Sequence, residues 1–383
     1  MIAVIHLRDS SFVGGPEKQI LGQCARLDRS RFEPIVVSFA RTKPNALTQA
    51  ASELDLRADS LPDGKLAVAS AVGRLRAIAR GAGDCVVVAS GFKADMTVAL
   101  AGRRIPWIAW FHGHTGASPR VRLYEALDLI AVRRAEAVIA VCERAGSDLR
   151  RTGLREVRTI PNAVDAERIA AQGTRRSARA ELGIDDGELV VGTVSRLSPE
   201  KGIGYFIESA PMILRKHPSA RFVVIGDGPL GAELRRHAQR LGLSDRLGFA
   251  GHRPEAALLV KAMDVFVLPS IRENLPVALL EAMACGVSVV ATDVGGVREV
   301  LAGTGVQPVS PRSAQAIAEA VTALLDAPQL RAIRGQVLCA RAGRYSFDRQ
   351  ARLMETVIEQ AWHGNVKQRW CRSSQYLRKP RVR

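Results

Sequence analysis

The sequence of 383 residues contains no long apolar segment. No stretch approaches the roughly 18–20 consecutive apolar residues that one membrane-spanning helix requires, which excludes such a span. The first eight residues lack a basic region ahead of a long apolar segment, so they predict a first strand rather than a signal peptide. With 47% hydrophobic and 24% charged residues, the chain does not belong to the disordered class.

Cysteine is sparse and widely spaced. The six cysteines form neither a C-x-x-C pair nor a Cys/His cluster of zinc-binding spacing. Most stand among apolar residues, which predicts buried free thiols in a reducing compartment. His112 and His114 are two residues apart, but no third metal ligand lies near them in sequence. A metal site is therefore disfavoured.

Several signatures of nucleotide and nucleic-acid binding are also missing. Aromatic residues make up only 5% of the chain, and there is no recognisable RNA-binding motif. The sequence has neither a G-x-G-x-x-G fingerprint nor a P-loop, which weighs against a nicotinamide dehydrogenase and an ATPase.

What the sequence has in excess is positive charge. Lys+Arg 55 against Asp+Glu 38 gives +17 and a pI of about 10.4. Such a balance suggests nucleic acid, an anionic membrane or a phosphorylated ligand as partner. Lysine occurs only nine times, so the excess is mostly arginine and partly a compositional bias. Residues 364–383 hold seven bases and no acid, which leaves +10 on the other 363 residues.

Short apolar runs alternate with helical patterns, which predicts parallel sheets with helices on both faces. In the first half we expect strands at 3–7, 35–39, 85–89, 107–111, 137–141 and 158–160. In the second half we expect them at 189–194, 222–225, 247–250, 265–268 and 287–291.

The alternation breaks at 165–188, which is rich in Ala, Arg and Gly and is expected to be an interdomain connection with a short helix. We therefore predict two doubly wound domains, residues 1–165 and 166–347, with a cleft at the C-terminal ends of their strands. A last helix at 348–363 is expected to pack back on the first domain, and 364–383 forms a basic tail.

Two glutamates flank the start of a helix that is predicted after the strand 265–268. Pro276 suits the first turn and Gly286 the end, which places Glu273 at the helix mouth and Glu281 inside the helix. The free N–H groups of a helix N-terminus favour phosphate. A carboxylate beside them would repel a phosphate unless it binds sugar hydroxyls. The spacing alone also fits two glutamates on a solvated helix face.

Two cations follow the first strand of the second half. Arg196 and Lys201 could converge on one anion at the edge of the sheet, or be two exposed cations on a loop. The next strand runs into the turn Gly226-Asp227-Gly228, where glycine by itself indicates only turn geometry.

In this order and context, the motifs resemble the retaining glycosyltransferases of family 4, which have the GT-B fold of two facing Rossmann-like domains. The resemblance covers nearly the whole chain and is strongest from 137 to 301. The matching residues are Gly14 and Gly15 after the first strand, His112, the segments 160–165 and 291–299, Arg196 with Lys201, Gly226-Asp227-Gly228, and Glu273 with Glu281 in an E-x7-E arrangement. Asn274 and Ala163 stand where the family commonly has glycine, which concerns loop shape and no charged residue.

The resemblance implies that the second domain binds a nucleotide-diphosphate sugar. Arg196 and Lys201 would neutralise the diphosphate as the glycosidic bond breaks. Glu281 would accept hydrogen bonds from the ribose, and Glu273 would bind the transferred sugar. The other implied site residues are the N–H groups at Asn274 and Leu275, Gly226 and Asp227 on the donor side, Gly14 and Gly15 in the first loop, and His112, which would approach the sugar from the first domain.

The resemblance further implies retaining, metal-independent transfer of a hexose-type sugar to a glycan or polyprenyl-linked acceptor. No residue is an obvious nucleophile, so the implied route is front-face transfer in which a leaving phosphate oxygen assists deprotonation of the acceptor. The two cations replace a metal, and no clear Asp-x-Asp motif is present, so no metal or cofactor is expected. The implied setting is bacterial lipopolysaccharide, exopolysaccharide or glycolipid synthesis.

The first domain would bind the acceptor. Its helix 118–134 mixes four arginines with apolar residues, and such a helix, like the basic tail, suits an anionic membrane surface. A core-facing helix with a solvated face is the alternative. We expect a cytoplasmic protein, peripheral on the inner face of the cytoplasmic membrane, with no nucleic-acid partner.

Two other functions stay open at this point. A sugar-nucleotide epimerase could share the GT-B fold, although the two cations and the E-x7-E pair favour transfer. A basic nucleic-acid-binding protein would agree with the pI but not with the low aromatic content.

Overall fold

The computed structural model describes residues 1–10, 12–40, 45–64, 67–113 and 119–376, and it describes side chains as far as residue 364, apart from 119 and 120. The chain divides into unit 1, Met1–Ile160 with Phe347–Arg383, and unit 2, Pro161–Ser346. The boundary expected after Asp165 therefore lies inside unit 2. His114 and residues 377–383 of the basic tail lie outside the described part.

Unit 1 contains a parallel sheet whose described strands run in the order β3-β2-β1-β4-β5-β6-β7. Every residue of β4 is buried, as expected for a parallel strand covered by helices on both faces. The strands are β1 (Ile2–Arg8), β2 (Phe32–Ala40), β3 (Arg57–Pro62), β4 (Cys85–Ser90), β5 (Trp107–Phe111), β6 (Ala137–Ala140) and β7 (Val157–Thr159).

Strand β3 has no counterpart among the expected strands. It lies at the sheet edge and pairs only with β2 among the described strands, so most of its side chains are partly exposed. An edge strand of this kind needs no apolar run, and Pro62 at its end is tolerated there. The sequence pattern therefore contained no strand signal.

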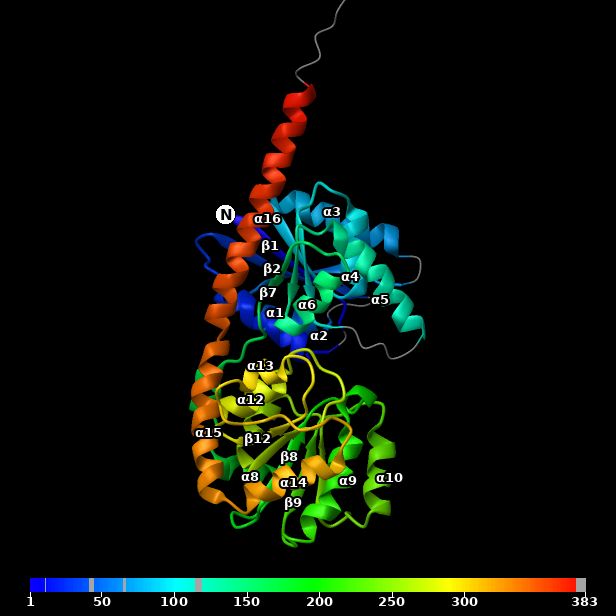
Figure 1. Ribbon diagram of the computed structural model, residues 1–383. Helices are drawn as coiled ribbons and strands as arrows, with labels where there is room; N and C mark the ends of the chain where they lie inside the picture. The colour runs from blue at the N-terminus through cyan, green and yellow to red at the C-terminus, as the bar shows by residue number, and fades with distance from the viewer. Residues whose placement is uncertain (11, 41–44, 65–66, 114–118, 377–383) are drawn as a thin grey trace, which may run out of the picture. The chain divides into compact units, whose positions relative to one another are not determined.

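In sequence, most helices of unit 1 lie between consecutive strands. The exception is α16, which follows unit 2 in the chain and packs beside α1 (Figure 1). Gln350 of α16 donates a hydrogen bond to the side-chain oxygen of Gln19 at 2.9 Å, and Glu355 accepts one from the Asp28 backbone N–H at 2.9 Å. The helices are α1 (Gly15–Arg26), α2 (Ala46–Glu53), α3 (Val68–Ala82), α4 (Phe92–Ala101), α5 (Pro119–Ala131), η1 (Val132–Arg134), α6 (Glu143–Arg151) and α16 (Phe347–Tyr376). The backbone of α16 thus stays helical beyond the expected end at 363.

Unit 2 contains a second parallel sheet, whose described strands run in the order β10-β9-β8-β11-β12. The strands are β8 (Val190–Val194), β9 (Arg221–Ile225), β10 (Leu247–Gly251), β11 (Val265–Leu268) and β12 (Ser288–Ala291). The α-helices are α7 (Ala166–Ala171), α8 (Arg175–Leu182), α9 (Ile203–Leu214), α10 (Gly231–Arg240), α11 (Ala256–Leu259), α12 (Val277–Ala284), α13 (Val297–Leu301), α14 (Ala314–Leu325) and α15 (Pro328–Ala342). The 3₁₀ turns are η2 (Pro199–Lys201), η3 (Val260–Ala262) and η4 (Gly343–Tyr345).

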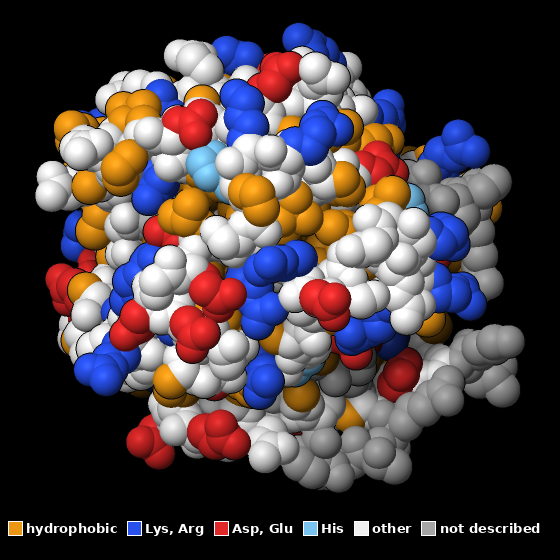
Figure 2. Space-filling view, turned by 90° about the horizontal axis from the view of Figure 1, so that it is seen from below, with side chains coloured by type: hydrophobic (Ala, Val, Ile, Leu, Met, Phe, Trp, Pro, Cys, Tyr) orange, Lys and Arg blue, Asp and Glu red, His pale blue; other side chains and the backbone are white. Residues whose placement is uncertain are grey.

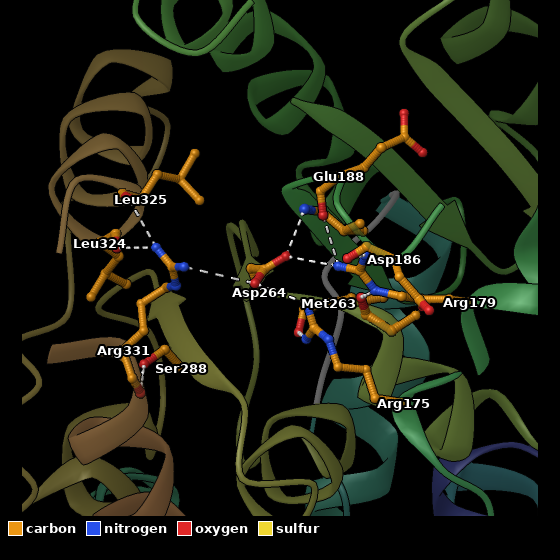
Figure 3. A network of polar contacts seen from close by, with 12 residues as sticks. Arg175, Arg179, Asp186, Glu188, Met263, Asp264, Ser288, Leu324, Leu325 and Arg331 are labelled. Atoms are coloured by element: carbon orange, nitrogen blue, oxygen red, sulfur yellow. Dashed lines mark hydrogen bonds and ion pairs between the residues drawn. The ribbon is translucent and has the colours of Figure 1, made fainter. Parts of the chain in front are cut away.

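The segment 165–188, which was expected to connect the domains through one short helix, is instead part of unit 2 and contains both α7 and α8. The reason is Arg179, which is 1% exposed on α8. Its guanidinium pairs with Asp264 at 3.1 Å and donates to the carbonyl oxygen of Glu188 at 2.8 Å (Figure 3). It also donates to the carbonyl oxygen of Asp185 at 2.6 Å. The arginine-rich composition of this segment is typical of a solvated linker, but one of its arginines, Arg179, is buried.

Asp264 is the centre of this network. Besides Arg179, it accepts hydrogen bonds from the Val190 backbone N–H at 2.9 Å and from Arg175 at 3.0 Å, and Arg331 of α15 lies 3.8 Å away (Figure 3). The carboxylate therefore ties α8 and α15 to the beginning of β8. Burial, and secondarily the charge of Arg175, lower the pKa of Arg179 from its usual value.

Basic and acidic side chains are interspersed over the face seen from below in Figure 2, so the net charge is not gathered into one positive surface there. None of the described helices is long and apolar enough to cross a membrane. The five cysteines whose side chains are described are all free thiols, and three of them, Cys24, Cys85 and Cys142, are buried.

We expect Arg179→Met to destabilise unit 2 by about 3 kcal/mol, because it leaves the largely buried Asp264 carboxylate without its main cation. Urea unfolding of the full chain measures this loss. Arg175→Met is the matched control, since Arg175 contacts the same carboxylate but its side chain is 47% exposed. This substitution should lower the free energy of unfolding by less than about 1 kcal/mol. Equal small losses for the two variants would contradict this assignment.

Candidate functional site

The candidate site of unit 2 lies where the strand order reverses. In the order β10-β9-β8-β11-β12, the strands that follow β8 in sequence are added on one side of it, and β11 and β12 are added on the other side. The switch point therefore lies between β8 and β11. Loops at the carboxyl ends of the two strands that flank such a switch point leave a crevice for a ligand. Arg196 and Lys201 follow β8, and Glu273 follows β11, so three of the predicted site residues stand on these two loops.

The two loops are joined by an ion pair between the Lys201 ammonium and the Glu273 carboxylate. The Lys201 side chain is 23% exposed and that of Glu273 is 14% exposed, so the pair is partly screened from water. Ser270 also donates a hydrogen bond to Glu273, at 3.4 Å. Two residues 72 positions apart in sequence thereby hold one another at the edge of the sheet. Arg196 is exposed on the same loop as Lys201.

The loop after β9 packs directly on the loop that carries Arg196. Gly226 has φ +134°, and a Cβ atom there would overlap the carbonyl oxygen of Ser195. The Leu197 N–H donates to the Asp227 carbonyl oxygen at 2.9 Å. Glycine at position 226 is therefore required by backbone-to-backbone contact, and this contact places Gly226 and Asp227 beside the loop of Arg196.

The loop after β12 supports Glu273 and Asn274 from the other side. Gly295 has φ +51°, and a Cβ atom there would overlap the Glu273 carbonyl oxygen. The Gly296 N–H donates to the Asn274 carbonyl oxygen at 2.5 Å, and the Thr292 hydroxyl donates to the carbonyl oxygen of Ser270 at 2.6 Å. The backbone of the β11 loop is thus held by the loop that follows β12.

Asn162 positions the same loop, although its place in the motif predicted no such contact. The side chain is buried, and its Nδ2 donates to the Leu275 carbonyl oxygen at 2.7 Å. Val164 secures the segment itself, because its N–H donates to the Tyr345 carbonyl oxygen at 2.7 Å. The contact between Asn162 and Leu275 spans 113 residues, so no local pattern could have indicated it.

Helix α12 starts immediately after this loop. Pro276 is its N-cap and Gly286, at φ +68°, follows its C-terminal end. The first N–H groups of a helix have no partner within the helix and create a positive potential. Leu275 precedes them, and Glu281 lies one turn into α12, where its side chain is buried.

Gly14, Gly15 and His112 belong to unit 1. Glu17 caps the start of α1 by accepting a hydrogen bond from the Gly14 N–H at 2.9 Å, and it also pairs with Arg8 at the end of β1. Glu17 is buried, so this pair fixes the loop that contains Gly14 and Gly15. These are the residues after β1, one of the two strands at the switch point of the first sheet.

His112 follows β5. Burial and, secondarily, the charge of Arg8 lower the pKa of His112 well below its ordinary value, so the imidazole is neutral near pH 7.

Two carboxyl groups of unit 1, those of Asp95 and Asp128, were not predicted from the sequence to be of interest. Burial raises the pKa of Asp95 well above its usual range, and the nearby, hydrogen-bonded Asp128 carboxyl raises it further.

Within the described residues, no group of three or more His, Cys, Asp or Glu side chains is arranged to hold a metal ion.

Two family models match the chain. One, described as Glycosyltransferase Family 4, matches residues 13–168, and the other, described as Glycosyl transferases group 1, matches residues 174–336. The boundary between the two matches falls near the start of unit 2.

Curated relatives align with part of the chain. The alpha-D-kanosaminyltransferase of Streptomyces kanamyceticus is 34% identical over 52% of this chain and 54% of its own length. The lipopolysaccharide core biosynthesis mannosyltransferase LpsB of Rhizobium meliloti is 30% identical over 60% of this chain and 66% of its own length. The chain thus spans somewhat more than half the length of these relatives.

Solved structures match nearly all of the chain in fold. HepE of Anabaena in complex with UDP-glucose has a TM-score of 0.83 at 23% identity, covering 94% of this chain and 100% of that one. The sucrose-phosphate synthase of Thermosynechococcus elongatus has a TM-score of 0.83 at 20% identity, covering 95% and 100%. The predicted fold class, two doubly wound α/β domains of GT-B architecture, is confirmed.

Proposed function

Because the chain belongs to the glycosyltransferases of family 4 and group 1, we propose that it transfers a hexose-type sugar from a nucleotide-diphosphate sugar to a glycan or lipid-linked acceptor. The observation that carries the proposal is the Lys201–Glu273 ion pair on the two loops at the switch point of unit 2. Cation, carboxylate and helix N-terminus meet there at the sheet edge, which is where doubly wound domains bind ligands.

In the proposed site, Arg196 and Lys201 neutralise the diphosphate. Charge on the leaving nucleoside diphosphate grows as the glycosidic bond breaks, so fixed cations stabilise the transition state more than the ground state. The Lys201–Glu273 pair supports this role because the carboxylate holds the ammonium at the edge of the sheet. The N–H groups near Asn274 and Leu275, at the start of α12, supply further hydrogen bonds to phosphate oxygens. Gly226 and Asp227 complete the donor side beside Arg196.

The two glutamates have different tasks in this proposal. Glu273 binds hydroxyls of the transferred sugar, because its carboxylate stands beside the phosphate-binding cation. Glu281 accepts hydrogen bonds from the ribose hydroxyls, and its burial on α12 supports a role in binding rather than in solvation.

Unit 1 is assigned the acceptor. A neutral His112 suits hydrogen bonding to a sugar hydroxyl, which its lowered pKa supports. The loop of Gly14 and Gly15 is assigned to the phosphates or the acceptor, and the Arg8–Glu17 pair supports this by holding the loop in one conformation.

The transfer is proposed to retain the anomeric configuration. The bond between the anomeric carbon and the phosphate oxygen breaks while the acceptor oxygen bonds to the same face of that carbon. The acceptor proton passes to the leaving phosphate oxygen, which balances the step without an enzyme nucleophile. The setting is synthesis of cell-surface polysaccharide or glycolipid. That the relatives named above are transferases favours this function over an epimerase or a nucleic-acid-binding protein.

We expect one sugar donor among UDP, GDP and ADP sugars to raise the melting temperature by about 5–10 °C at a hundredfold excess over Kd. Lys201→Ala should abolish the shift because the diphosphate loses its cation, and Glu281→Gln should reduce it because the ribose loses its acceptor. Differential scanning fluorimetry measures both.

Lys216→Ala and Glu181→Gln are the matched controls for these variants. Both side chains are exposed on unit 2 and precede the amino ends of β9 and β8, at the opposite edge of the sheet from the candidate site. They should keep the full shift. Absence of a shift with every nucleotide sugar, or an equal loss in the control variants, would refute the proposed site.

The proposed reaction needs no metal, because Arg196 and Lys201 take its electrostatic role. Sugar transfer should therefore proceed at an unchanged rate in EDTA. A loss of activity that Mg²⁺ or Mn²⁺ restores would show this part of the proposal to be wrong.

The enzyme is also proposed to rest on the inner face of the cytoplasmic membrane through α5 and the basic tail. Leu123, Leu127 and Ile130 lie on one face of α5 and are 59%, 39% and 59% exposed. Arg122 and Arg133 are exposed close by. Apolar side chains flanked by arginine complement an anionic lipid surface.

Replacing both Leu123 and Ile130 with serine should lower partitioning onto phosphatidylglycerol vesicles about tenfold, measured by sedimentation. Ile333→Ser is the control, because Ile333 is 58% exposed on α15 of unit 2. A chain ending at residue 364 separates the contribution of the tail. Equal partitioning of the double variant and the wild type would exclude α5 as a membrane contact.

A further inference from the structure

A cavity of about 610 Å³ opens in unit 1 at the beginning of strands β4 and β5. The end of α3, the turn before β4, the turn between α4 and β5, and Trp362 of α16 surround it. We call it the β4–β5 cavity. Its volume falls within the roughly 300–1,000 Å³ that is usual for small-molecule sites.

The β4–β5 cavity lies at the opposite edge of the sheet from the candidate site residues of unit 1. Gly14 and His112 follow the carboxyl ends of β1 and β5, whereas the cavity lies at the amino ends of β4 and β5. A six-residue strand such as β4 separates the two edges by about 20 Å. The cavity is therefore distinct from the residues assigned to glycosyl transfer.

Four arginines line this cavity: Arg76 and Arg80 near the end of α3, and Arg103 and Arg104 in the turn before β5. Arg76 is held in place, since it donates to the carbonyl oxygens of Ala101 at 2.9 Å and Leu100 at 3.1 Å. These hydrogen bonds satisfy carbonyl oxygens at the C-terminal end of α4 and hold the Arg76 guanidinium at the wall of the cavity. Further N–H groups of the same guanidinium remain for a ligand.

The lining charges are strongly unbalanced. Asp84 is the one carboxylate against the four arginines in the lining, and it makes no ion pair with a described residue. Arg80 likewise has no side-chain hydrogen bond or ion pair within the described part of the chain. By contrast, Arg74 on the same helix pairs with Asp59 at 2.9 Å. With four guanidinium groups and one carboxylate in its lining, the cavity has an excess of positive charge.

The floor of the cavity is apolar. Cys85 and Ile105 are buried there, and the half-buried Trp362 forms a wall, with its ring 4.7 Å from that of His363. Guanidinium groups match phosphate oxygens in charge and geometry, and an indole face suits a planar or apolar group. The two kinds of surface together fit a ligand that has a phosphate at one end and an apolar or aromatic part at the other.

We propose that the β4–β5 cavity is a second anion site, which binds a phosphorylated ligand with its phosphate against Arg80, Arg103 and Arg104 and its remaining part against Trp362. The ligand is a soluble phosphate compound or the phosphate of a lipid headgroup, and the same guanidinium groups bind either. The assignment does not depend on the proposed glycosyl transfer.

Arginine footprinting of the full chain with phenylglyoxal, read by mass spectrometry, tests the site residue by residue. Millimolar pyrophosphate should slow modification of Arg80, Arg103 and Arg104 at least about fivefold, the slowing expected when ligand is at four times its Kd. Arg74 should change less than about twofold. Sodium chloride of equal ionic strength controls for screening.

Two variants keep the result specific to the cavity. Arg80→Ala should abolish the protection of Arg103 and Arg104, whereas Arg74→Ala, which removes the same charge from the same helix, should leave it intact. Because each residue is followed separately, anion binding near Lys201 does not enter the readout. Equal modification of the cavity arginines with and without pyrophosphate and with and without lipid phosphate would overturn the proposal.

The source of the phosphate is distinguished by vesicles. Phosphatidylcholine vesicles with and without phosphatidic acid replace pyrophosphate in the same footprint. Protection by pyrophosphate supports a soluble ligand, and protection only by vesicles that contain phosphatidic acid supports a lipid headgroup. Equal protection by phosphatidylcholine alone would contradict phosphate recognition.

Discussion

The candidate site depends on backbone-to-backbone packing of the loops at the carboxyl edge of the second sheet. Gly226 lies against Ser195, and Gly295 lies against Glu273, with no room for a side chain at either contact. Because the loops are fixed in this way, Lys201 and Glu273 are held together as an ion pair. Positioned charges need little reorganisation when a diphosphate departs, and this is the physical basis of the proposed catalysis.

Arginine serves three different physical purposes in this chain. Arg179 is buried and organises the polypeptide around Asp264, so its removal affects folding. Arg196 is exposed on the loop that follows β8, and the proposed function assigns it to the diphosphate. In unit 1, Arg76, Arg80, Arg103 and Arg104 line one cavity. A net charge of +17 therefore says little about function until each cation is placed.

Much of the fold follows from local sequence signals. The run Cys85–Ser90 is apolar because parallel strands are buried on both faces, and it forms β4 as expected. Strand β3 was missed because an edge strand with half-exposed residues has no such run. Lys201 and Glu273 could be placed together because both follow strands, and parallel strands end at one edge. The contacts of Asn162 and Arg179 could not be predicted in this way. Their partners lie 113 and 85 residues away and are brought close only by tertiary packing.

The most direct test of the central claim needs no knowledge of the acceptor, because water can replace it slowly. Proton NMR would follow the protein with the nucleotide sugar that stabilises it and identify the anomer of the sugar first released. We predict release of the nucleoside diphosphate together with sugar in the donor's own anomeric configuration, and loss of this cleavage in Lys201→Ala. Release of the opposite anomer, or undiminished cleavage by Lys201→Ala, would contradict the account.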